Sequence, residues 1–123
     1  MAKIAIMGFG TVGSGVLEVC RRNAQSIARR AGESVEVKYI LDVRDFSTSP
    51  DAALFVKDIN VILNDPEVKA VVETIGGTKF AYPFVKQCLA AGRSVCTSNK
   101  EMVATYGAEL MALAKANGVA FLF

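Results

Sequence analysis

The sequence predicts an α/β fold in which a doubly wound parallel sheet of about six strands has helices on both faces. Short apolar runs rich in branched residues alternate along the chain with segments whose apolar residues recur at helical spacing. The connections between them are short, and no repeat, low-complexity tract or linker interrupts the 123 residues. Such alternation requires right-handed crossovers between parallel strands, so we expect one domain over residues 1–123.

The first two elements have the clearest patterns. Residues 3–7 form an apolar run that ends at glycines, which is typical of a strand buried on both faces. From Thr11 to about Ala31 apolar residues recur at helical spacing, so a single amphipathic helix that closes near Gly32 is expected. The apolar positions of that helix are Val12, Val16, Val19, Cys20 and Ile27.

The alternation continues to the end of the chain. Further strands are expected at residues 35 to about 43, 54–56, 70–75, 94–97 and 119–123. Between them we expect a brief helix capped by Asp58, a helix after Thr78 with Pro83 in its first turn, and a helix that ends at residues 117–118. The second of these helices should end at Gly92 and bury Phe84, Val85, Cys88 and Leu89, and the third should bury Val103, Leu110 and Leu113.

Composition excludes several classes of function. The 14 basic and 12 acidic residues are spread along the chain and give a net charge of +2, so no basic run indicates nucleic acid as a partner. No apolar stretch approaches the roughly 20 residues that span a bilayer, and the amino terminus lacks the features of a signal peptide. We therefore expect a cytoplasmic protein with neither a nucleic-acid nor a membrane partner.

The titratable residues narrow the chemistry further. The chain has no histidine, which excludes serine and cysteine catalysis through histidine and makes a metal site unexpected. Cys20, Cys88 and Cys96 are widely separated and form no C-x-x-C pair, so we expect three buried free thiols.

The most informative motif is G-x-G-x-x-G at residues 8–13, directly after the first strand and at the start of the first helix. This setting is that of the dinucleotide fingerprint of Rossmann-type folds, in which the glycines allow a tight turn, close approach of the pyrophosphate and close helix packing. The predicted cofactor-binding residues are Gly8, Phe9, Gly10, Thr11, Val12 and Gly13. The alternative is a glycine-rich turn without a ligand.

Two residues at the end of the second strand compete to bind the adenosine ribose. An acid such as Asp42 would accept a hydrogen bond from the 2′-hydroxyl of NAD, whereas Arg44 would accommodate the 2′-phosphate of NADP. The other interpretation of Arg44 is a solvated loop charge paired with Asp45. We favour NADP, with NAD tolerated.

Further candidates follow the fourth and fifth strands, whose carboxyl ends should lie at the same edge of the sheet. Ile75, Gly76 and Gly77 would border the cofactor there, unless the two glycines are a plain turn. Lys100 follows the fifth strand and would lie nearer the nicotinamide, unless it is an ordinary surface lysine in the first turn of a helix.

Four segments together resemble the amino-terminal domain of homoserine dehydrogenase: GFGTVGSGV at 8–16, VVETIGG at 71–77, AAGRSVCTSNKEMVA at 90–104 and ANGVAFLF at 116–123. The resemblance covers nearly the whole chain. It implies interconversion of L-homoserine and L-aspartate 4-semialdehyde in threonine and methionine biosynthesis, with NAD or NADP as the hydride carrier. It also implies that Lys100 supports catalysis beside the nicotinamide and the substrate.

In that family a second domain supplies the substrate pocket, the principal catalytic residues and the homodimer interface. The resemblance therefore implies that the catalytic domain of the parent enzyme lies outside this chain, which would bind dinucleotide with little or no turnover. The segment from Asp42 to Asp45 departs from the commoner family form and leaves the cofactor preference open. The alternatives are another two-domain dehydrogenase of the aspartate pathway and a noncatalytic module that senses NAD(H).

Overall fold

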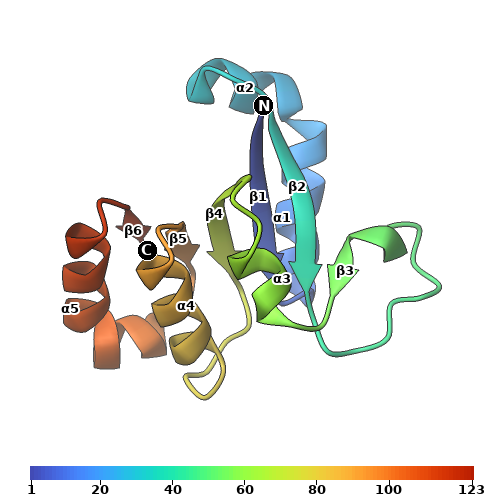
Figure 1. Cartoon of the computed structure of the whole chain (residues 1–123). Coiled ribbons are helices and arrows are strands. Elements are labelled where there is room, and N and C mark those ends of the chain that lie inside the picture. The colour runs from blue at the N-terminus through green and yellow to red at the C-terminus, as the bar shows by residue number, and fades with distance from the viewer.

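The structure, a computed structural model, describes residues 1–123 and contains one sheet of six parallel strands in the order β3-β2-β1-β4-β5-β6 (Figure 1). The strands are β1 (Ala2–Met7), β2 (Val35–Leu41), β3 (Phe55–Val56), β4 (Val68–Glu73), β5 (Ser94–Thr97) and β6 (Phe121–Leu122). The chain reverses its direction of travel across the sheet between β3 and β4, so β1 and β4 are neighbours. This arrangement confirms the predicted doubly wound fold, which binds ligands where the strand order reverses.

The helices are α1 (Thr11–Arg22), α2 (Ala24–Ala31), α3 (Ile59–Leu63), α4 (Ala81–Ala90) and α5 (Lys100–Ala116), with a short 3₁₀ turn at Ala52–Leu54. The single helix expected over residues 11–31 is wrong, because Asn23 leaves helical geometry at φ −108° and ψ 25° and separates α1 from α2. Asparagine competes with helical hydrogen bonding. After the break, α2 turns across the amino ends of β1 and β2 (Figure 1).

Two apolar clusters hold the sheet between its helices. The larger joins α3, α4 and α5 to one face of the sheet and includes Met7, Ile62, Leu89 and Met102, all fully buried. The smaller joins α1 to the opposite face through Ile6, Leu17, Val37 and Ile40. Burial of each such side chain contributes roughly 1.5–3 kcal/mol to folding, so both faces of β1 and β2 stabilise the region that carries the glycine turn.

Helices on the second face cover only the half of the sheet formed by β1, β2 and β3. On β4, β5 and β6 the side chains of Val72, Cys96 and Leu122 share that face at matching register positions, and Cys96 and Leu122 are exposed. The prediction that all three cysteines are buried is therefore wrong, since Cys88 is buried, Cys20 is half-buried and Cys96 is exposed. All three are free thiols.

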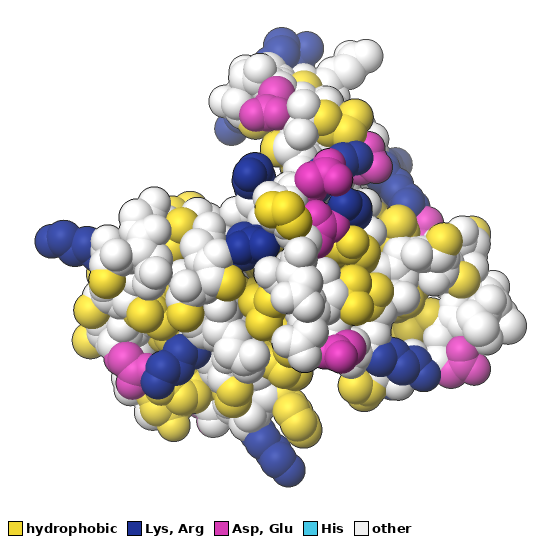
Figure 2. Space-filling view, in the orientation of Figure 1, with side chains coloured by type: hydrophobic (Ala, Val, Ile, Leu, Met, Phe, Trp, Pro, Cys, Tyr) yellow, Lys and Arg dark blue, Asp and Glu magenta, His cyan; other side chains and the backbone are white.

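Other expectations differ from the structure only in detail. Asp58 caps α3 through its carboxylate, as predicted, and α4 ends in an αL glycine at Gly92. Phe84, Val103 and Leu113 are half-buried rather than buried, while Met102 and Ala114 supply the buried face of α5 with Leu110. None of the helices has the length and apolar character needed to cross a membrane. Figure 2 shows basic and acidic side chains interspersed on the face in view.

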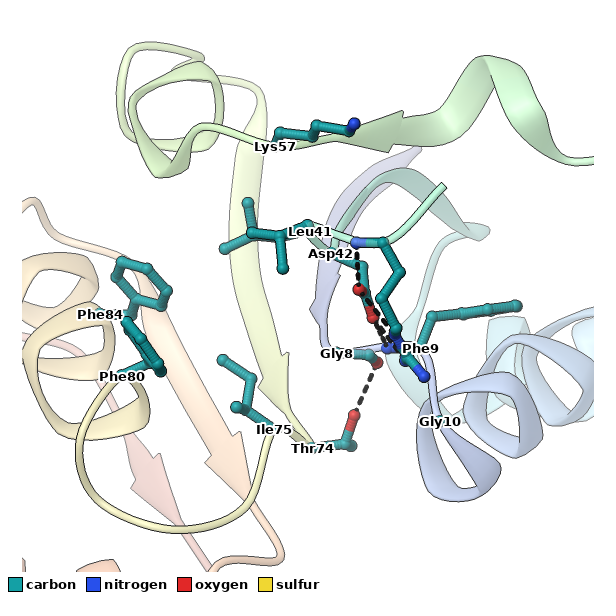
Figure 3. A pocket seen from close by; sticks show the side chains of 12 residues that line it. Gly8, Phe9, Gly10, Leu41, Asp42, Lys57, Thr74, Ile75, Phe80 and Phe84 are labelled. Atoms are coloured by element: carbon teal, nitrogen blue, oxygen red, sulfur yellow. Dashed lines mark hydrogen bonds and ion pairs between the residues drawn. The ribbon is translucent and has the colours of Figure 1, made fainter. Parts of the chain in front are cut away.

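The strand ends matter most for the site. β2 stops at Leu41 and β4 at Glu73, two residues before the predicted ends, so Asp42, Thr74 and Ile75 lie in the loops at the carboxyl edge of the sheet. The N–H groups of Asp42 and Thr74 still donate to the Val56 and Met7 carbonyls, so the neighbouring strands fix where these loops begin. The turns after β1, β2 and β4 meet at this edge (Figure 3).

Candidate dinucleotide site

The first turn after β1 is anchored on both sides by neighbouring strands. Gly8 adopts a φ of +94°, which favours glycine, and its N–H donates to the Leu41 carbonyl at 2.8 Å. The Thr74 hydroxyl donates to the Gly8 carbonyl at 2.8 Å and lies 3.1 Å from the Met7 carbonyl. The ends of β2 and β4 therefore fix the path of the chain into α1.

The glycines of the motif perform different tasks. A Cβ atom placed on Gly13 would lie 2.0 Å from the Gly8 carbonyl oxygen and 2.9 Å from the Thr74 hydroxyl. Gly13 is thus required by packing of α1 against the turn. A Cβ on Gly10 would meet no protein atom within 4 Å, and its φ of −87° is open to any residue. Nothing inside the protein requires glycine at position 10, and the space above it is free for a ligand.

The start of α1 has the properties of an anion site. The first N–H groups of a helix have no intrahelical partner, and here no side chain caps them and no acidic residue occupies the first turn. Thr11 and Val12 are exposed. Exposed amides and the helix dipole together favour a phosphate. The uncapped helix and the open space above Gly10 fit the pyrophosphate of a dinucleotide.

A pocket of about 510 Å³ extends from this turn along the carboxyl edge. Its lining includes six of the predicted cofactor-binding residues, Gly8, Phe9, Gly10, Asp42, Arg44 and Ile75, together with Leu41, Val43, Lys57, Thr74, Phe80 and Phe84. Figure 3 shows Ile75, Phe80 and Phe84 on one side and Phe9 and Asp42 on the other. Its apolar walls and basic rim suit a planar base joined to phosphorylated sugar.

Asp42 and Arg44 form a close ion pair at the rim of the pocket. Arg44 donates from Nε and from its terminal nitrogen to the two oxygens of the carboxylate at 3.0 and 2.8 Å. The Arg44 side chain together with the N–H groups of Arg44 and Phe9 lowers the pKa of Asp42 to about 2. The alternative in which Arg44 pairs with Asp45 is wrong, because Asp45 instead accepts from the Ser47 N–H.

The remaining predicted residues lie beside this pocket rather than in it. Gly76 donates its N–H to Glu73, and the Gly77 carbonyl accepts from the Asn99 side chain. Both glycines have positive φ, so they form a tight turn after β4. Lys100 begins α5, is exposed, and lines a separate hollow of about 420 Å³ with Thr97, Ser98, Val103, Ala104 and Phe123.

A buried polar network joins these two parts of the edge, and sequence reasoning missed it. Glu73 is fully buried and accepts from the Ile75 N–H at 2.7 Å and from the Thr97 hydroxyl. Thr97 in turn accepts from the Asn99 N–H, and Asn99 caps α5 through the Met102 N–H. A buried carboxylate needs such donors. The charge within the apolar strand VVETI is the only signal for it in the sequence.

Two further residues that the sequence did not single out belong to the pocket. Lys57 follows β3, and the Val56 carbonyl at the end of β3 accepts from the Asp42 N–H. This pairing places the exposed Lys57 in the lining of the same pocket as Arg44. Phe80 precedes α4 and is exposed, although it is a large aromatic side chain. An exposed aromatic ring beside a pocket indicates a ligand contact, but the exposure of Phe80 can be known only from the fold.

Comparison with known proteins agrees with this geometry. The sequence model of the family described as homoserine dehydrogenase, NAD binding domain, matches residues 8–123. The chain belongs to this family. It is 40% identical to a homoserine dehydrogenase of Pseudomonas aeruginosa and 31% identical to one of Bacillus subtilis, in both cases over 98% of the chain. It spans only 28% and 29% of the length of these two relatives.

Solved homoserine dehydrogenases share the fold. The enzyme from Thiobacillus denitrificans superposes over 99% of this chain with a TM-score of 0.90 and 41% identity, and the chain covers 29% of it. A hyperthermophilic archaeal homoserine dehydrogenase in complex with NADPH superposes over 99% of the chain and has a TM-score of 0.80 and 27% identity. The chain covers 43% of that protein. The NAD(P)-binding domain of homoserine dehydrogenase is therefore the family assignment.

Replacement of Gly13 by alanine should destabilise the protein by about 3 kcal/mol, because its Cβ would overlap the Gly8 carbonyl. Gly15 is the matched control, since it lies in the same helix with no atom near its Cβ position. Gly15→Ala should stabilise the helix by about 0.5–1 kcal/mol. Urea unfolding of both variants measures the difference, and equal free energies of unfolding would contradict the packing role of Gly13.

The Asp42 carboxyl should titrate with a midpoint near 2 in the folded protein, as measured by NMR of its carboxyl carbon. Because this pKa is depressed, the stability that the charged form contributes is present above the ordinary aspartate value of 3.8 and is lost as pH falls through 2. In Arg44→Ala the midpoint should rise toward 3.8, while that of Asp45, whose pKa is lowered chiefly by Ser47, should stay unchanged. An unchanged Asp42 midpoint would show that Arg44 is not its partner in solution.

Proposed function

We propose that this chain is the cofactor-binding part of an enzyme that interconverts L-homoserine and L-aspartate 4-semialdehyde with NAD or NADP. The observation that supports this most directly is the open space above Gly10 at the uncapped start of α1. The family match adds the reaction, because the relatives over this chain are homoserine dehydrogenases. Threonine and methionine biosynthesis is the corresponding pathway, and the cytoplasm the corresponding compartment.

The bound nicotinamide would carry the hydride, so the protein needs to supply binding, orientation and electrostatics. We assign the pyrophosphate to the backbone N–H groups of Thr11 and Val12, with Gly10 giving clearance. The adenosine would occupy the pocket between Ile75 and Arg44, with Phe80 offering an aromatic face to the base. These roles need no nucleophile or titrating histidine, which fits a chain that has no histidine.

The nicotinamide half would lie toward β5, beyond Gly76 and Gly77. Lys100 is our candidate for a supporting catalytic group there, because its ammonium can donate to a ribose hydroxyl or to the substrate oxygen. Glu73, Thr97 and Asn99 act as positioning residues in this proposal, since their hydrogen bonds set the backbone on either side of the nicotinamide. The archaeal relative binds NADPH, which supports a cofactor with a 2′-phosphate here as well.

Substitution of Gly10 by valine should weaken dinucleotide binding without unfolding the chain. A Cβ atom at position 10 meets no protein atom within 4 Å, and the φ of −87° is open to valine. Because glycine is the better residue at a helix N-cap, the free energy of unfolding should fall by about 1 kcal/mol, which leaves the chain folded. The valine methyl groups would occupy the space assigned to the pyrophosphate. Calorimetric titration should show Kd values for NAD and NADP raised at least about tenfold. Unchanged affinity in a folded variant would refute the proposed site.

The chain by itself should bind cofactor yet reduce NADP slowly or not at all in the presence of homoserine. The residues that would hold homoserine are proposed to belong to the part of the relatives that this chain does not span, together with the homodimer interface. The absorbance of the reduced nicotinamide measures turnover, with the Gly10→Val variant as the blank. Homoserine-dependent reduction by the wild-type chain would overturn this division of labour.

A further inference from the structure

The Asp42 carboxylate has no acceptor position left for a ligand. One oxygen accepts from the Arg44 N–H and from Arg44 Nε, both at 3.0 Å. The other accepts from the Phe9 N–H at 2.9 Å and from the terminal nitrogen of Arg44 at 2.8 Å. A carboxylate offers about four lone-pair positions, and these four bonds fill them. Only 8% of the Asp42 side chain is exposed.

Arg44, in contrast, has hydrogen-bond donors left for a ligand. A guanidinium carries five N–H donors, of which two point at Asp42, so three remain available. The Arg44 side chain is 61% exposed at the rim of the pocket. Its planar charged group therefore presents a free donor edge to a ligand that enters the pocket.

An aromatic cluster of Phe9, Phe46 and Phe55 gives Arg44 a second support. The guanidinium carbon lies 5.4 Å from the centre of the Phe46 ring, within the range of a cation–π contact. Phe46 stacks on Phe55 at 4.3 Å and meets Phe9 edge to face at 5.5 Å. The loop that carries Arg44 is thus attached to the glycine turn and to β3.

The two cofactors make opposite demands on this pair. The 2′-hydroxyl of NAD can donate to a carboxylate, but Asp42 has a free acceptor position only after one of its four bonds is broken. The 2′-phosphate of NADP needs donors, and Arg44 provides them without rearrangement. The guanidinium also offsets the charge of Asp42, which would otherwise repel the phosphate.

We propose that Asp42 is a positioning residue that holds Arg44 at the 2′ position, and that the pair selects the 2′-phosphorylated dinucleotide over NAD. This inference rests on the proposed cofactor site and replaces the prediction that Asp42 binds the ribose directly. Because the same carboxylate accepts the Phe9 N–H, it also ties the 2′-phosphate subsite to the glycine turn.

The test compares Asp42→Asn with Asp45→Asn, a matched loss of one charge at the next residue, which is exposed and whose carboxylate accepts from Ser47 rather than from Arg44. Calorimetric Kd values for NADP and NAD are measured for both variants. Asparagine can still accept the Phe9 N–H but presents an amide to Arg44. We expect Asp42→Asn to raise the Kd for NADP about tenfold and to leave that for NAD within about twofold. Asp45→Asn should leave both within about twofold.

A double-mutant cycle with Arg44→Ala separates positioning from a general loss of structure. If Asp42 acts through Arg44, Asp42→Asn should no longer change the ratio of the two Kd values in the Arg44→Ala background. If Asp42 instead accepts a hydrogen bond directly from the ribose, the result should be the reverse: Asp42→Asn should weaken NAD binding and leave NADP binding equal or tighter. That result would overturn the inference and leave the cofactor site intact.

The wild-type chain supplies a test that needs no variant to fold. Adenosine 2′,5′-bisphosphate should bind at least about tenfold more tightly than adenosine 5′-monophosphate, because only the former reaches Arg44 with a phosphate. Equal affinities would reject selection by the pair. Failure of both probes and of both dinucleotides to bind would instead reject the proposed function itself.

Discussion

The site depends on the close contact between the first turn of α1 and the turn that follows β1. Gly13 brings the helix so near to Gly8 that a single methyl group would collide with the carbonyl oxygen. The Thr74 hydroxyl, directly after β4, donates to the same carbonyl. This contact determines where the helix begins and therefore where its unpaired N–H groups point. The other walls of the pocket adjoin this helix start.

The topology explains why the contact occurs at this place. The chain leaves β1 at the centre of the sheet, between β2 and β4, so residues from both neighbours reach the first turn. Leu41 holds Gly8 from one side and Thr74 holds it from the other. Asp42 extends the same support to Phe9 and Arg44. The proposed pyrophosphate and 2′ subsites thus share one hydrogen-bonded base.

Much of this could be predicted from the sequence, because periodicity and glycine spacing are local properties. The strands, the order of elements and the glycine turn at residues 8–13 follow from them. The break at Asn23 could not be inferred, since the apolar spacing continues across it. The exposure of Cys96 could not be inferred either, because a short apolar strand has the same sequence pattern whether helices cover one face of the sheet or both.

The side-chain pairings of the site were the least predictable part. The Thr74 hydroxyl bonds a carbonyl 66 residues away, and Asp42 accepts from an N–H 33 residues away. Only the fold brings such groups together. The sequence identified Asp42 and Arg44 as rivals for the ribose, whereas the structure pairs them. Charged residues two positions apart in a loop can do either, and the backbone path after Leu41 decides the outcome.

A crystal structure of the chain with NADP is the most direct test that the uncapped start of α1 holds the diphosphate. We expect a diphosphate oxygen about 2.7–3.2 Å from the backbone nitrogen of Thr11 or Val12, above Gly10. Nucleotide density elsewhere on the protein, with solvent over Gly10, would contradict this placement.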